Sequence, residues 1–171
     1  MTRPHEDIEV GIFRGDQRAL QAHFADWELL KSERPGRLDP WEEDDWLELP
    51  IHQVFAFPPG SPPLQQQWEP GGDELQFFLN DVEDGVWLCR RDPSVKRPAA
   101  EVWTRSASGL PIVAPEIQLL YKAKHHLEKD EHDFRVTVAR LNREQREWLR
   151  RSLEVVHPGD PWLAPLEALD G

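Results

Sequence analysis

The sequence predicts an α+β domain, in which a mixed sheet from the first two-thirds of the chain is followed by a C-terminal three-helix group. Before residue 114, apolar and polar residues alternate in short runs, the pattern of half-buried strands. After residue 114, apolar residues recur at helical spacing. Two strand-like runs, ELQFFLND and GVWLCRRD, flank the turn residues of VEDG and indicate a hairpin.

The first predicted strand covers residues 7–13, where Ile8, Val10 and Ile12 alternate with polar side chains. Asp16 is placed to cap a short helix that follows this strand. The stretch DPWEEDDWLEL is expected to lie on the core as a loop or a short strand. A surface loop is expected over 58–73, because this segment is rich in Pro and Gly. Further strands are predicted at 27–30, 54–57, 74–81, 85–92, 101–104 and 110–113.

Three helices are predicted in the last third of the chain. Pro115 suits the first turn of a helix, whose apolar stripe includes Ile117 and Leu120. A second helix is expected from about Lys129. Asn142 and Gln145 have the spacing of a capping box and open a third helix, which ends before the Pro-Gly pair at 158–159.

Length and composition restrict the class of protein. The 171 residues suit a single domain over 1–171, mainly sheet over 1–114 and helical over 115–171. A net charge of −12 argues against nucleic acid as a partner, because it repels phosphate backbones. No apolar run approaches the roughly 20 residues of a membrane span, so no membrane partner is expected. One cysteine excludes an internal disulfide, and the expected location is cytoplasmic.

Two acids on the first strand raise a functional question. Asp7 and Glu9 are two residues apart, so on a strand both side chains point to the same face. This pattern has two readings: either the face is exposed to solvent, or the pair holds a cation.

Several stretches together resemble a known family. They are HEDIEV, the FFLND…WLCRRDP hairpin and, most specifically, LPIVAPEIQLLYKAKHHLEKDEHDF. They resemble the nucleotidyltransferase-fold family of bacterial aminoglycoside and lincosamide adenylyltransferases, in the polymerase-beta-like superfamily. The resemblance implies an antibiotic-resistance type of reaction, with Mg²⁺ as cofactor. A nucleoside monophosphate would pass from ATP or another NTP to a hydroxyl of a small-molecule acceptor. The resemblance also allows a homodimer.

Matched to this chain, the family's metal-binding and catalytic acids are Asp7, Glu9 and Glu74. Carboxylates suit magnesium, and Glu74 could double as the base for the acceptor hydroxyl. Asp81 is a second candidate for the third acid and ranks below Glu74, because it lies nearer the hairpin turn. Many members carry Asp-x-Asp where this chain has Asp-x-Glu, which changes the geometry of the pair.

The resemblance also bears on nucleotide binding. Lys122 and Lys129 match basic positions near the family's phosphate or helix-packing region, which implies cofactor-binding roles. Similar enzymes grip the triphosphate with a Gly-Gly turn and a helix before the paired acids. Because Asp7 stands so near Met1, the sequence is expected to be either truncated or a member that has lost the reaction.

Alternatives to an enzyme therefore stay open. One is a catalytically inactive nucleotidyltransferase-fold protein that binds a ligand or a partner, and a further one is an antitoxin-like member of the superfamily. Trp41 and Trp46, within an acidic loop, are candidates for contacts with a cationic acceptor or for packing of the loop. His125 and His126 fit no familiar zinc spacing and are expected at a solvated helix end.

Overall fold

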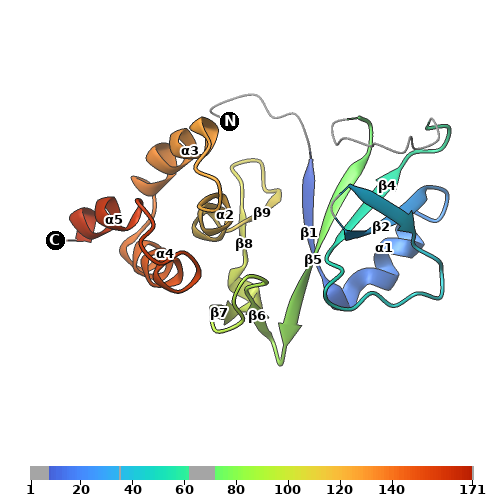
Figure 1. Cartoon of the computed structure of the whole chain (residues 1–171), viewed down its shortest axis with the longest axis horizontal. Helices are drawn as coiled ribbons and strands as arrows, with labels where there is room; N and C mark the ends of the chain where they lie inside the picture. Colours follow the sequence, from blue (N-terminus) through green and yellow to red (C-terminus); the bar gives the residue numbers. More distant parts are fainter. Residues whose placement is uncertain (1–7, 35, 62–71, 171) are drawn as a thin grey trace. The chain divides into compact units, whose positions relative to one another are not determined.

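The computed structural model describes residues 8–34, 36–61 and 72–170. Figure 1 shows strands in the first part of the chain and helices toward its end, so the predicted α+β class is confirmed. The chain divides into two compact units, Met1–Val82 and Glu83–Gly171. This division falls at the end of a strand, whereas the sequence predicts the change from sheet to helix at residue 114.

The first unit is a mixed sheet that carries one α-helix. Its strand order is β3-β2-β4-β5-β1, in which β1 and β5 run parallel and the other neighbours run antiparallel. The elements are β1 (Glu9–Phe13), a 3-10 turn (Arg14–Asp16), α1 (Gln17–His23), β2 (Glu28–Arg34), β3 (Arg37–Pro40), β4 (Gln53–Phe57) and β5 (Leu75–Glu83). The sequence did not predict β3, because charged residues on both sides of Leu38 obscure its alternation.

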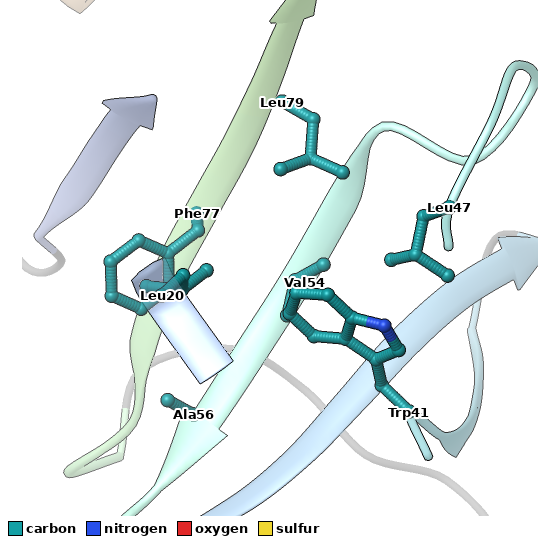
Figure 2. Close-up of a cluster of buried hydrophobic side chains, with 7 residues drawn as sticks. All are labelled: Leu20, Trp41, Leu47, Val54, Ala56, Phe77 and Leu79. Carbon is teal, nitrogen blue, oxygen red and sulfur yellow. The ribbon is translucent and has the colours of Figure 1, made fainter. Parts of the chain in front are cut away.

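One face of this sheet packs against α1 and the acidic loop. Figure 2 shows the side chains that meet there, and all of them are buried: Leu20, Trp41, Leu47, Val54, Ala56, Phe77 and Leu79. The loop reaches the core through Trp41, whose indole N–H donates to the Asp45 carbonyl at 3.2 Å. The expectation that DPWEEDDWLEL lies on the core is therefore confirmed.

The second unit consists of short strand pairs followed by helices. An Asp84-Gly85 turn leads into it, and both residues have positive φ (48° and 77°), as a tight turn requires. The elements are β6 (Val86–Leu88), β7 (Lys96–Pro98), a 3-10 turn (Ala99–Glu101), β8 (Trp103–Arg105), β9 (Pro111–Val113), α2 (Pro115–Lys122), α3 (Glu128–Val138), α4 (Arg143–Val156) and α5 (Leu163–Asp170). Antiparallel pairing joins β6 to β7 and β8 to β9.

The three predicted helices are α2, α3 and α4, and α5 is an additional helix that the sequence did not predict. Turn-forming residues at 158–161 end α4, but Trp162 and Leu166 then bury their side chains in the helical group. The Leu, Ala and Glu residues of α5 favour a helix, and packing of Trp162 and Leu166 stabilises one that is only eight residues long. Within the group, α2 contacts α3 and α4, and α4 contacts α5. In the described part of the chain, no helix has the length and apolar character needed to cross a membrane.

The capping box predicted at the start of α4 is confirmed. The Asn142 side chain accepts the Gln145 N–H at 2.9 Å, and the Gln145 side chain accepts the Asn142 N–H at 3.0 Å. We expect Asn142→Ala to lower the free energy of unfolding by about 1 kcal/mol, because one N-terminal N–H loses its acceptor. Urea denaturation checks this value, with Asn142→Ser as the control that keeps an acceptor. Equal losses in both variants would contradict the capping role.

Candidate functional site

Two of the three predicted acids belong to the sheet face opposite the α1 core. Glu9 is the first residue of β1 and lies beside Gln76 of β5 in the parallel register. The neighbouring residues Val10 and Phe77 belong to the α1 core. Side chains alternate along a strand, so Glu9 and Gln76 point to the other face. Glu74 is two residues before Gln76, in the segment that leads into β5, and the period of the strand, if continued to it, assigns it to that face.

This face changes from apolar to polar across the strands. Along one row of paired residues, Leu30 of β2 lies beside Phe55 of β4, which lies beside Gln76. Leu30 and Phe55 are buried, Gln76 has only 8% of its surface exposed, and Glu9 at the end of the row is exposed. The acids therefore occupy the polar margin of the face, where a charged side chain keeps its access to water.

A short backbone contact orients the Glu74 carboxylate. Its Oε2 accepts the backbone N–H of Gly72 at 2.9 Å. A Cβ at residue 72 would stand 2.8 Å from that same oxygen. The glycine thus permits the close approach, and the hydrogen bond holds the half-buried Glu74 side chain against the turn that precedes β5.

Two further acids, Asp7 and Asp81, were considered for the metal site. Asp7, the first of the paired acids, lies outside the described residues, so its role stays a prediction. Asp81 forms an ion pair with Arg14, with 2.5 Å between Nε and Oδ1. Arg14 also donates to the carbonyls of Leu47 and Ile51, at 3.1 and 2.7 Å. Asp81 is thus a structural partner of Arg14.

The predicted cofactor-binding lysines belong to the second unit. Lys122 Nζ lies 3.0 Å from Asp130 Oδ1 and 2.9 Å from Asp133 Oδ2. Burial lowers the pKa of Lys122, but hydrogen bonds and charge from the two aspartates outweigh burial and leave it raised. These ion pairs join α2 to α3, so a phosphate at Lys122 would compete with two carboxylates. Lys129 is exposed in the first turn of α3, and both cofactor-binding roles stay predictions.

The donor chemistry of the acids fits magnesium. Mg²⁺ prefers carboxylate oxygens, and Glu9 on β1 and Glu74 just before β5 carry them. Over 8–34, 36–61 and 72–170, no group of three or more His, Cys, Asp and Glu side chains is placed to hold a metal ion. The predicted set reaches three ligands only with Asp7.

The two tryptophans of the acidic loop, Trp41 and Trp46, have different surroundings. Trp41 is part of the core, so the hypothesis that it contacts a cationic acceptor is wrong for this residue. Trp46 is 47% exposed, and the Arg18 guanidinium lies 5.9 Å from its ring centroid. The cation that Trp46 contacts is therefore one from α1.

Sequence reasoning missed one polar residue in the second unit. His125 is exposed as predicted, but His126 is not a solvated residue of a helix end. Its two ring nitrogens contact carboxylates of Glu131 and Asp160. The second of these contacts joins residues far apart in sequence, and no local motif indicates it.

Comparisons with known proteins add no assignment. No protein-family model matches the sequence, and no curated protein or solved structure matches it either. The functional argument therefore depends on the residues of this chain and on their geometry.

Proposed function

We propose that this chain is a magnesium-dependent nucleotidyltransferase-like protein. It transfers a nucleoside monophosphate from ATP or another NTP to a hydroxyl of an aminoglycoside- or lincosamide-like small molecule. The observation that supports the proposal is the parallel pairing of β1 with β5, in which Glu9 lies beside Gln76, two residues after Glu74. The resemblance of HEDIEV and of PEIQLL…KDEHDF to that family supports it.

Electrostatics explains why such a site needs a cation. The chain carries a net charge of −12, so carboxylates alone would repel a triphosphate. Asp7, Glu9 and Glu74 would hold magnesium, which neutralises the triphosphate and activates the hydroxyl when it is bound. Glu74 is also the residue proposed to accept the proton of the acceptor hydroxyl. Its hydrogen bond from Gly72 fixes the carboxylate orientation, and proton transfer requires a fixed orientation.

Transfer is tested with purified protein, Mg²⁺, each of four α-labelled NTPs and a panel of aminoglycosides and lincosamides. We expect labelled acceptor with at least one NTP, and a loss of about 10²–10⁴-fold in rate for Glu74→Gln, as for removal of a general base. Glu9→Gln should also lose transfer, because it removes a charged ligand. Glu33→Gln, at an exposed position on β2, is the matched control. Absence of transfer to every acceptor would overturn the resistance-type reaction.

Nucleotide binding is measured separately by thermal unfolding. A ligand present at 100 times its dissociation constant stabilises a protein by about 2.7 kcal/mol. We expect magnesium with the accepted NTP to raise the Tm of the wild type and of Glu33→Gln, but not that of Glu9→Gln. A raised Tm without transfer would favour the alternative of a catalytically inactive binding module.

A further inference from the structure

A histidine between α2 and α3 is held by carboxylates from two separate parts of the second unit. His126 Nδ1 lies 2.8 Å from Oε1 of Glu131, in the first turn of α3. His126 Nε2 lies 3.0 Å from Oδ2 of Asp160, in the turn between α4 and α5. Each ring nitrogen thus faces a carboxylate, and the imidazole links the start of α3 to the segment that precedes α5.

The backbone at His126 is in an unusual conformation. Its φ is +48°, in the left-handed region that few residues other than Gly adopt and in which Asn, Asp and His are the most frequent exceptions. Such a conformation persists when surrounding contacts over-determine it. At His126 the two carboxylate contacts provide that constraint.

Trp162 shares both carboxylates with the histidine. Its indole N–H donates to Glu131 Oε1 at 2.9 Å, and its backbone N–H donates to Asp160 Oδ1 at 2.9 Å. The His126 ring lies edge-on to the Trp162 ring, with 4.8 Å between centroids. Trp162 is buried and stacks on Phe134 of α3, with 4.3 Å between centroids. This residue immediately precedes α5, so the group anchors the start of that helix on α3.

The protonation state of the imidazole decides whether both contacts are favourable. A neutral imidazole has one N–H donor, whereas the imidazolium has two. In the neutral form, one ring nitrogen would face a carboxylate oxygen lone pair to lone pair. The Asp160 carboxylate has only 2% of its side chain exposed, which favours the neutral tautomer that keeps its N–H on Nε2. The contact that loses its donor is then the one to Glu131 of α3, whose side chain is 41% exposed.

We propose that His126 is a proton-dependent clasp that holds Trp162 and the start of α5 on α3 when it is charged, and releases them when it loses its proton.

Other charged groups lie near the clasp. His157 is close enough to interact with His126, and it contacts Arg91 at 2.9 Å and interacts with Lys124. Arg91, Lys124 and His126 oppose a charge on His157, whereas Glu131 and Asp160 favour the charge on His126.

The pKa of His126 agrees with this arrangement. Partial burial lowers it, but hydrogen bonds and charge from Glu131 and Asp160 outweigh burial and raise it above the ordinary 6.5. For His157, burial and the charge of Arg91 lower the pKa, so as pH rises this neighbour loses its proton before His126 does. A histidine with a raised folded pKa contributes stability that is complete below about pH 6.5 and is lost as pH rises through the folded value.

The experiment compares thermal unfolding of wild type, His126→Asn and His125→Gln between about pH 5.5 and about pH 9. Asparagine tolerates positive φ, so His126→Asn removes the titrating ring with little added backbone strain. His125→Gln is the matched control, because His125 is the exposed neighbour. We expect the Tm of wild type to exceed that of His126→Asn by about 2–4 °C at the acid end, and the difference to vanish at the alkaline end. A difference that does not change with pH would overturn the proposal.

Two measurements on the wild type keep the test decisive if His126→Asn fails to fold. An NMR titration of the His126 ring should give a pKa above the ordinary value of 6.5, and a value below 6.5 would overturn the proposal. Hydrogen exchange should speed up in α5 relative to α4 as pH rises through the His126 transition, after correction for intrinsic exchange rates. Equal protection of both helices across that transition would also overturn the proposal.

Discussion

Replacement of Glu116 by alanine is expected to lower the free energy of unfolding by about 3–5 kcal/mol, the cost of leaving a buried charge without its partner. Glu116 lies in the first turn of α2 and has only 1% of its surface exposed. Its Oε1 accepts a hydrogen bond from Arg97 Nη1 at 2.6 Å, and its Oε2 accepts one from Gln145 Nε2 at 2.9 Å. The carboxylate thus joins β7, α2 and the start of α4.

The remaining partners of Arg97 cannot replace Glu116. Glu101 lies 3.2 Å away but is largely exposed, and such pairs contribute little. Trp148 offers its ring face at 5.1 Å from the guanidinium carbon. Arg97 Nε is buried and has no hydrogen-bond acceptor among the described residues. Loss of Glu116 would therefore leave a poorly solvated cation inside the second unit.

Urea unfolding of three variants separates these contributions. Glu101→Ala, the control, removes the exposed partner of the same arginine and should cost about 1 kcal/mol or less. The double variant Arg97→Met, Glu116→Leu should recover much of the loss, because it removes both buried charges and keeps similar volume. Equal losses for Glu116→Ala and Glu101→Ala would show that Glu116 is not the partner that matters.

Features of the fold with a local cause could be predicted from the sequence. The alternation in EVGIF predicts β1, and the apolar run in QVFAF, which is buried on both faces, predicts β4. Asn142 and Gln145 predict the start of α4, because a capping box needs only residues four positions apart at most. For these elements, the predicted type of secondary structure was correct and the predicted bounds were nearly correct.

Features that depend on contacts distant in sequence could not be predicted. Helix α5 forms where Trp162 packs on Phe134, and turn-forming residues before it suggest only an end to structure. Lys122 and Glu116 look like surface charges in the sequence, yet each is paired in the interior of the second unit. Burial of a charge leaves no local pattern, because its partner comes from another element.

In the candidate site, too, features with a local cause could be predicted and features that depend on distant contacts could not. The spacing of Asp7 and Glu9 predicts a shared strand face, which requires only the period of a strand. The parallel pairing of β1 with β5 brings Glu9 to the strand that follows Glu74. These two strands are separated in sequence by most of the residues of the first unit. Parallel strands are joined by long connections, so periodicity cannot reveal which strands are neighbours.

Leu79 gives the largest expected effect in the first unit. It lies on β5 beside Ile12 of β1, has 1% of its surface exposed and belongs to the core cluster in Figure 2. Leu79→Ala should lower the free energy of unfolding by about 2–5 kcal/mol, because it removes buried methyl groups and leaves a cavity. Leu79→Met conserves volume and should cost less than about 1.5 kcal/mol.

The same variant also distinguishes the two faces of β5. Leu79 points to the α1 core, whereas Gln76 and Glu74 belong to the opposite face. If the proposed site is on that opposite face, Leu79→Ala should lose stability while the folded protein keeps its affinity for magnesium with NTP. Urea unfolding measures the first quantity, and calorimetric titration at a temperature well below the Tm measures the second. Leu49→Ala, at a 60% exposed loop position, is the control for both. A loss of affinity in Leu79→Ala alone would mean that binding depends on core packing, and would place the ligand on the α1 side of the sheet.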